Sequence, residues 1–177
     1  MSDHDDVLAL SNCAAPGSVL FEQGAHMIEK LERLVDEVGA LHSKLILIVG
    51  NPRTGKTALL RALAKNRGVT VLSVGSELGN RLSMVPQRQR HLQTTTLLRE
   101  LADQHATADL LLMDNLELLF DRTLQLDPLD LLKRHAHVKR VVAVWPGDLR
   151  DGRLTYAEMG HPEHQDYSLA GVVPFEI

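Results

Sequence analysis

Residues 50–57 carry the clearest chemical signal in the chain. They read GNPRTGKT, which fits the pattern G-x-x-x-x-G-K-S/T at every position. Glycine at the fixed positions allows backbone conformations closed to other residues, so that successive N–H groups can face one phosphate. Lys56 then reaches the β- and γ-phosphates, and the hydroxyl of Thr57 binds Mg²⁺. The motif therefore predicts a P-loop for ATP or a close relative. The predicted nucleotide-binding residues are Gly50, Asn51, Pro52, Arg53, Thr54, Gly55, Lys56, Thr57 and Ala58.

A second candidate, Asp114, follows the apolar run LLLM at residues 110–113. A carboxylate at the end of a buried strand lies at the edge where ligands bind in open α/β sheets. We therefore expect Asp114 to hold Mg²⁺ together with Thr57, both being oxygen donors. The alternative is that Asp114 only caps the next helix. Lys56 and Asp114 are the first two predicted catalytic residues.

The residues after Asp114 depart from the usual hydrolytic pattern, which has glutamate at the next position. Asn115 stands there instead, and its amide can position a water but cannot take its proton. Glu117, two residues further on, is the candidate base, with a partner's residue as the alternative. We assign Asn115 and Glu117 to the catalytic group and expect hydrolysis that is weak or depends on a partner.

Other parts of a complete ATPase site are missing from the pattern. Val144-Trp145-Pro146 stands where many such ATPases carry a small polar residue that senses the γ-phosphate. The 30 residues after Gly147 predict a strand and a tail rather than a helical lid domain. An arginine that completes the site must then come from the core or from a partner. The candidates are Arg122, Arg134 and Arg140, each of which also fits an ordinary surface arginine.

The elements that position these residues alternate between apolar strands and helices. Strands are expected at residues 44–49, 69–74, 109–113 and 138–145, with a short one at 154–157. Helices are expected at 19–41, 57–65, 76–81 and 94–105, and another opens at Asp127-Pro128 and runs through Arg134. The alternation predicts an α/β fold, with a parallel sheet covered by helices on both faces. We expect a loose leader over residues 1–17 and a single domain over residues 18–177.

The separation of Lys56 from Asp114 leaves room for a further strand and its crossover helices. This favours the AAA+ and RecA-like class of P-loop proteins, in which a strand is inserted between the two motif strands. Small-molecule kinases usually place these strands side by side and need a mobile lid with arginines, which the sequence does not indicate.

Composition narrows the setting. No apolar run approaches the roughly 18 residues that span a bilayer, the N-terminus is acidic, and Cys13 is the single cysteine. We therefore expect a soluble cytoplasmic protein without a membrane partner. The net charge of −4 also argues against a generally basic nucleic-acid binder.

The charge is nevertheless uneven, because between residues 61 and 99 only Glu77 opposes seven cations. Three interpretations stay open: a solvated helix face, a patch for nucleic acid, or arginines for a neighbouring subunit's phosphates. The residues that would contact DNA are Arg61, Arg81, Arg88, Arg90 and Arg99.

The tail contains His161, Glu163 and His164 within four residues. These types can bind a metal, but no further ligand cluster stands beside them, and Pro162 argues against a helix that would align them. A structured turn is the expectation.

Several segments together resemble the BrxF family, the small P-loop proteins of BREX bacteriophage-defence systems. They are GNPRTGKT, PQRQR at 86–90, LLMDNLELLFD at 111–121, VVAVWPG, and LTYAEMGHPEHQDY at 154–167. The resemblance covers most of the chain from about residue 19. Its most specific parts are DNLELLFD within the segment 111–121 and YAEMGHPE within the segment 154–167. It implies a cytoplasmic ATP-binding component that works beside a DNA methyltransferase, a large ATPase and other defence proteins. By position, residues 50–57 would hold the nucleotide and Asp114 the magnesium.

Three functions follow from these features. The first is an ATPase whose nucleotide state controls assembly with itself, as a homo-oligomer, or with defence partners. The second is a nucleotide-gated DNA-binding module with little hydrolysis of its own. The third is a small-molecule kinase, which the strand spacing disfavours.

Overall fold

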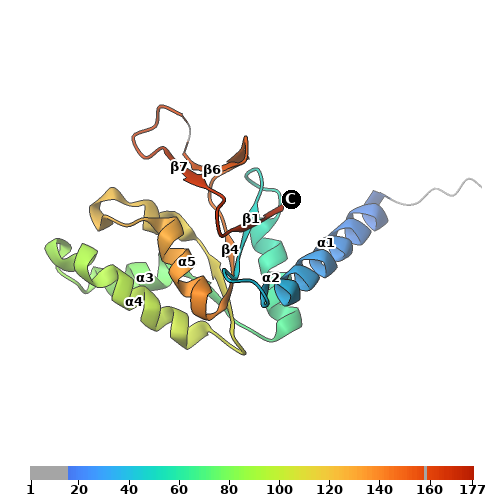
Figure 1. Cartoon of the computed structure of the whole chain (residues 1–177), viewed down its shortest axis with the longest axis horizontal. Helices are drawn as coiled ribbons and strands as arrows, with labels where there is room; N and C mark the ends of the chain where they lie inside the picture. Colours follow the sequence, from blue (N-terminus) through green and yellow to red (C-terminus); the bar gives the residue numbers. More distant parts are fainter. Residues whose placement is uncertain (1–15, 158) are drawn as a thin grey trace, which may run out of the picture.

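A five-stranded parallel sheet forms the centre of the protein in a computed structural model that describes residues 16–157 and 159–177 (Figure 1). Its strands lie in the order β2-β3-β4-β1-β8. Their bounds are Leu45–Val49 for β1, Val71–Ser73 for β2, Leu110–Asp114 for β3, Arg140–Val144 for β4 and Val173–Glu176 for β8. Strands β1 and β3 are buried along their whole length, as expected of continuous apolar runs in a sheet covered on both faces.

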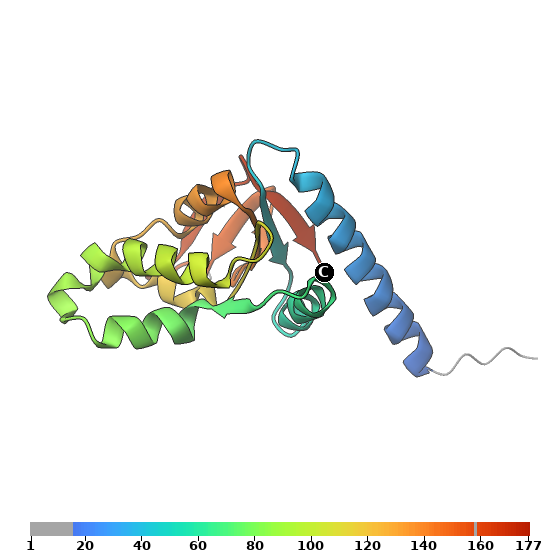
Figure 2. The same cartoon turned by 90° about the horizontal axis from the view of Figure 1, so that it is seen from below.

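Helices cover both faces of this sheet. Helices α1 (Pro16–Val38) and α2 (Lys56–Arg67) pack on Ile46 and Ile48 of β1, which point to one face. Helices α3 (Val74–Ser83), α4 (Arg90–His105) and α5 (Pro128–Val138) pack on the other face with Leu45 and Leu47. Figure 2 shows α1 and the connection between α3 and α4 at opposite ends of the molecule. The predicted α/β class is confirmed.

The sheet order also bears on the class of P-loop protein. Strand β4 pairs with β1 through Leu45↔Val141 and with β3 through Leu110↔Arg140, so it separates the two motif strands. An inserted strand was predicted, but it is not the strand that lies between the motifs along the chain, because β2 forms the edge of the sheet. The separation argues against the side-by-side arrangement of small-molecule kinases.

Most helix ends follow local sequence signals. The side chain of Asp127 accepts a hydrogen bond from the amide of Asp130 (2.9 Å) and caps α5, with Pro128 in its first turn. Gly68 ends α2 in the left-handed conformation, with φ of 64°. Helix α4 begins at Arg90 rather than at residue 94, after a 3₁₀ turn, η1 (Gln87–Gln89). Residues 1–15 of the expected leader, with Cys13, lie outside the described part of the chain, and α1 already includes Pro16.

The segment after β4 differs most from the expectation of one short strand and a tail. It forms an antiparallel sheet of β5 (Leu149–Arg150), β6 (Arg153–Tyr156) and β7 (Gln165–Ser168), and the chain then returns as β8 beside β1. The small sheet is held by tertiary packing on Trp145, which the lengths of such short strands do not reveal. Among the described residues, no helix is both long and apolar enough to cross a bilayer.

Candidate nucleotide-binding site

The P-loop connects the end of β1 to the start of α2, as its sequence pattern requires. A side chain at Gly50 would collide with the main-chain oxygen of Ile177 and the hydroxyl of Thr54, so this position needs glycine. The loop closes on itself, because the Thr54 hydroxyl donates to the carbonyl of Asn51 at 2.8 Å. Gly55 occupies the N-cap position of α2 in the left-handed region, with φ of 93°. No side chain caps this end of the helix. The first N–H groups of α2 are thus left to bind an anion.

Lys56 lies between the P-loop and the end of β4. Its ammonium group donates to the carbonyl of Gly50 at 2.6 Å and to that of Trp145 at 3.1 Å. Burial lowers the pKa of Lys56, while the charges of Asp148, Glu117 and Asp114 act in the opposite direction. An ammonium group has three donors, so one more remains for a phosphate oxygen.

Asp114 ends β3 and is 6% exposed. One of its oxygens accepts a hydrogen bond from the amide of Asn115 at 2.9 Å. Two strand spacings, about 9–10 Å, separate β3 from β1, so a cation and its waters fit between the two motifs. A carboxylate and the hydroxyl of Thr57 are the hard oxygen ligands that Mg²⁺ prefers, and the residues present therefore fit this ion.

Asn115 and Glu117 lie differently with respect to this site. The side-chain amide of Asn115 donates to the hydroxyl of Ser73 at 2.9 Å, on the side of β3 away from the P-loop strand. Its carbonyl accepts the amide of Gly75 at 2.9 Å, and its φ of 54° is left-handed. Glu117 is exposed, and its charge acts on Lys56. Glu117 is thus near enough for its charge to act on the P-loop lysine, whereas the Asn115 side chain is bonded to Ser73.

Trp145, which the sequence marked only as a departure from the usual pattern, is fully buried at the end of β4. Its amide donates to Ile48 at 2.9 Å and its ring N–H to the carbonyl of Thr155 at 2.9 Å. Sequence reasoning missed that its carbonyl contacts Lys56, since main-chain contacts leave no residue pattern. The ring belongs to a group that we call the aromatic cluster, made of Phe120, Trp145, Tyr156 and Tyr167.

Two hollows flank the P-loop. One, of about 590 Å³, is mainly apolar and lies between α1 and α2, with Met27, Ile28, Ala58 and Ala62 in its walls. The other, of about 560 Å³, is more polar and lies between Asn51 and the small antiparallel sheet. In the sequence, the only sign of the first hollow is the pair of small residues Ala58 and Ala62, which lie one turn apart on the same face of α2.

A comparison with known families decides the identity of this site. Residues 46–139, more than half of the chain, match the model of the ATPase family associated with various cellular activities (AAA). The chain belongs to the AAA family. No curated protein matches it. The AAA match includes both the P-loop and Asp114, and it supports ATP binding and ATPase activity; residues 140–177 lie outside it.

The three arginines considered as completing this AAA site have different surroundings. Arg140 lies at the opposite edge of the sheet, where it donates to the carbonyls of Val35 and Ala108. Arg134 lies on α5 and pairs with Asp130 at 2.7 Å. Arg122 begins the short helix η3 (Arg122–Leu124), is exposed, and makes no ion pair with the described residues.

The cations of residues 61–99 do not form one patch. Arg67 pairs with Asp36 of α1 at 2.9 Å, and Arg81 pairs with Glu100 of α4 at 3.0 Å. Arg61 is exposed on α2, on the sheet face opposite to α4. Arg88 and Arg90 remain together, in and beside η1.

The tail histidines form the expected turn. The amide of His164 donates to the carbonyl of His161 at 3.0 Å, and the amide of Glu163 donates to the His161 ring at 3.2 Å. Within residues 16–157 and 159–177 no group of three His, Cys, Asp or Glu side chains is arranged to hold a metal ion.

Proposed function

We propose that this AAA protein is an ATPase subunit of a BREX phage-defence system, and that its nucleotide state controls assembly with itself or with other defence proteins. The observation that carries the proposal is the contrast within one site. The phosphate-binding half is complete around Lys56, whereas the residue after Asp114 is turned toward Ser73. A site that binds well and hydrolyses poorly suits a switch better than a fast motor.

Nucleotide binding uses main-chain groups for the phosphates and side chains for the rest. The N–H groups at the start of α2 bind phosphate oxygens, and the third donor of Lys56 reaches the terminal phosphate. Bound magnesium supplies charge neutralisation at the phosphates, and Thr57 and Asp114 are the residues to hold it. The apolar hollow beside Ala58 and Ala62 has the size and lining for the base.

Hydrolysis requires a group that takes the proton of the attacking water. Glu117 has the right chemistry and acts electrostatically on Lys56, but its exposure keeps it hydrated and loosely positioned. A neighbouring molecule that covers this edge would fix Glu117 and remove water. Slow turnover in the isolated subunit follows from this arrangement.

A second copy of the chain is the simplest source of the missing cation. Arg122 extends from the loop that follows β3, and no described acidic residue pairs with it. Its guanidinium is therefore available to the phosphates bound by a neighbouring subunit. Arg134 is engaged by Asp130 on the same helix and serves as a matched control.

Membership of a BREX system is supported by the two segments that resemble the BrxF family most specifically. The first, residues 111–121, covers β3 and the short helix η2 (Leu116–Phe120), and the second, residues 154–167, covers the β6–β7 hairpin. The two segments pack on each other, since the Phe120 and Tyr156 rings stack at 3.7 Å between centroids. The two most specific segments of the resemblance are thus in contact in the fold.

The experiment records ATP hydrolysis and molecular mass on the same samples, with and without ATP and Mg²⁺. We expect the wild type to gain mass with both ligands present and Lys56→Ala to show neither mass gain nor hydrolysis. Arg122→Ala should bind ATP normally but lose mass gain and hydrolysis, whereas Arg134→Ala should match the wild type. Equal hydrolysis by Lys56→Ala and wild type refutes catalysis at the P-loop. An unchanged wild-type mass refutes self-assembly.

The defence role is tested separately in a host that carries the whole system. Replacing Lys56 by alanine in the chromosomal gene should abolish protection, measured as the efficiency of phage plaque formation. Full protection by that variant, at unchanged protein level, would remove the support for a nucleotide-dependent role in defence.

A further inference from the structure

The connection between α3 and α4 carries an unbalanced positive charge. No acidic residue occurs between Glu77 and Glu100, while four arginines do. Of these, Arg81 is neutralised by Glu100, and Arg99 lies along α4 beside Asp103 and Lys139. We call residues 84–93 the hairpin tip; it contains the other two arginines, and it projects at the end of the molecule away from α1 (Figure 2).

The two arginines of the hairpin tip are free to bind an anion. Arg88 is exposed and forms no ion pair with any described residue. Arg90 uses only its Nε, which donates to the carbonyl of Val85 at 3.1 Å and leaves both terminal nitrogens available. This hydrogen bond also holds the Arg90 side chain in place, so less side-chain freedom is lost on binding.

Local electrostatics make this surface attractive to anions. Helix α4 starts at Arg90 without a capping side chain and without an acid in its first turn. Helices usually carry acids at this positive end, whereas here Arg88, Arg90 and His91 lie there. Because no acidic residue of the described part of the chain forms an ion pair with Arg88 or Arg90, a bound anion would lower the free energy of the hairpin tip itself.

We propose that the hairpin tip binds the phosphate backbone of double-stranded DNA, an activity beyond the proposed ATPase switch. Two arginines without ion-pair partners supply two positive charges for phosphates, and the side-chain amides of Gln87 and Gln89 on η1 and of Gln93 in the first turn of α4 add neutral donors. No Phe, Tyr or Trp occurs between residues 76 and 105, so the surface lacks the stacking platform that unpaired bases need. This favours a duplex over a single strand.

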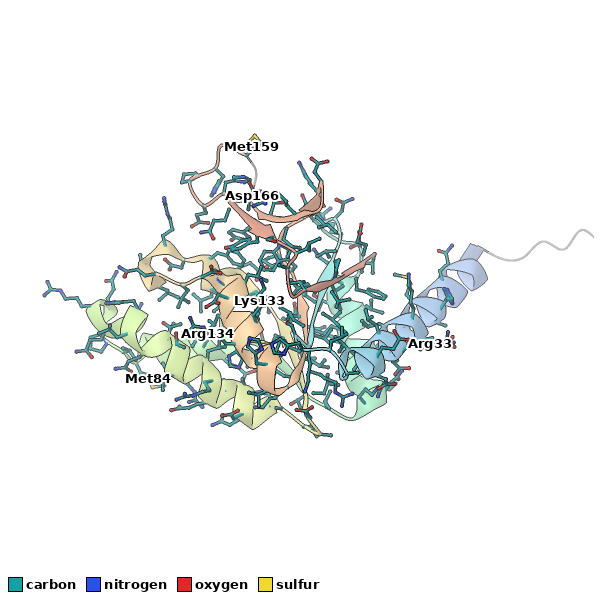
Figure 3. The ribbon with its side chains drawn as sticks, viewed as in Figure 1. Arg33, Met84, Lys133, Arg134, Met159 and Asp166 are labelled. Carbon is teal, nitrogen blue, oxygen red and sulfur yellow. The ribbon has the colours of Figure 1, made fainter. Side chains whose placement is uncertain are left out.

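The surface is smaller than the one predicted from the sequence, and this makes it testable. Arg61 lies on the other face of the sheet, and Arg134 lies on α5 (Figure 3), so both can be changed without touching the hairpin tip. Arg88→Gln removes one charge and breaks no described hydrogen bond, so the fold should be preserved. Arg61→Gln and Arg134→Gln remove the same charge elsewhere and are the controls.

The experiment measures binding of a DNA duplex of about 20 base pairs, roughly two helical turns, by fluorescence anisotropy. The salt concentration is varied from about 50 to about 200 mM, a range over which binding through phosphate contacts weakens steeply. We expect Arg88→Gln to weaken binding and to reduce the slope of log K against log salt by about 1. The double change with Arg90→Gln should reduce it by about 2, while both control variants keep the wild-type slope. Lys56→Ala, assayed without ATP, should also bind like wild type, which separates this activity from the ATPase.

Several results would overturn the proposal. Among them are no duplex binding by the wild type at the lowest salt and equal slopes for Arg88→Gln and wild type. The same loss in Arg134→Gln would show a general charge effect rather than a site. Tighter binding of a single strand of the same length would contradict the proposed preference for double-stranded DNA. Competition by polyglutamate as effective as competition by duplex would show an acidic polypeptide to be the partner.

Discussion

The P-loop and the aromatic cluster meet where Lys56 of the loop donates to the carbonyl of Trp145, and the two regions are stabilised in different ways. The P-loop consists of consecutive residues with local hydrogen bonds, such as that from Thr54 to Asn51 and that from Lys56 to Gly50. The aromatic cluster brings together four separate segments, with Trp145 at 5.3 Å from the Phe120 ring and 5.4 Å from the Tyr167 ring. The first region supplies the groups that bind, and the second fixes where they are.

The difference shows how binding and support are divided in this site. Changes in the P-loop should affect nucleotide binding more than folding, because the loop is largely exposed. Changes in the aromatic cluster should affect folding first, and binding as a consequence, because the Trp145 carbonyl holds Lys56. The following predictions test this division, beginning with the largest expected effect.

Trp145→Ala should lower the free energy of unfolding by about 3–5 kcal/mol, the usual cost of deleting a large buried aromatic side chain. It removes the contacts with Phe120 and Tyr167 and leaves the carbonyl of Thr155 without its donor. Denaturant unfolding measures the cost, and ATP binding is measured on the folded protein. Trp145→Phe, which keeps an aromatic ring, is the matched control and should cost less. A loss below about 1 kcal/mol for Trp145→Ala would show that the cluster does not support the fold.

Local signals explain why the P-loop and the main strands could be predicted from the sequence. The runs LILIV and LLLMD are buried along their whole length, and the spacing of glycine, lysine and threonine within eight residues specifies the phosphate loop. A short strand was predicted at residues 154–157, and β6 (Arg153–Tyr156) forms there, whereas β5 has only two residues, too few for a recognisable alternation. Pairing of β5, β6 and β7 and their packing on Trp145 depend on residues far apart in the chain, so neither this pairing nor the Lys56 contact was predictable.

For a related reason, the charges of the basic stretch are balanced differently in the fold than along the chain. Counting charges along the chain left Arg67 and Arg81 opposed only by Glu77. Their partners, Asp36 and Glu100, lie outside that stretch and meet the arginines only after helices pack. The hydrogen bond from Arg67 lowers the pKa of Asp36, and this effect is larger than the opposite effect of desolvation. Of the five predicted DNA contacts, Arg88 and Arg90 lie two residues apart in the hairpin tip, and neither forms an ion pair with a described residue.

Substitutions at Gly147 and Gly152 distinguish the cost of a steric clash from the cost of backbone strain. A Cβ at Gly147 would collide with the main-chain carbonyl of Thr155, and it would lie 3.0 Å from the ring nitrogen of Trp145. Because the main chain must move, Gly147→Ala should cost about 3 kcal/mol and weaken ATP binding through Trp145. Gly152 has open space around it and φ of 72°, so Gly152→Ala should cost only about 1 kcal/mol and leave ATP binding unchanged. Equal costs, measured by denaturant unfolding, would contradict the close approach.

The smallest effect concerns Tyr167, whose pKa burial raises above the ordinary value for tyrosine. The unfolded chain loses this proton near pH 10, whereas the folded chain still holds it, so stability should fall as the pH rises above 10. A single group contributes at most about 1.4 kcal/mol per pH unit to this fall. Tyr167→Phe should cost about 1 kcal/mol or less at pH 8, through the hydrogen bond to Gln165, and should flatten the decline above pH 10.

Urea unfolding of wild type and Tyr167→Phe over the range of about pH 8 to 11 measures this difference, since groups shared by both proteins cancel. Burial also raises the pKa of Tyr156, the other tyrosine of the chain, so Tyr156→Phe should flatten the decline too. Parallel curves for wild type and Tyr167→Phe would mean that the hydroxyl is hydrated in the folded protein. In that case the aromatic cluster would be open to solvent at β7, and it would hold the Trp145 carbonyl against Lys56 less firmly than the contacts indicate.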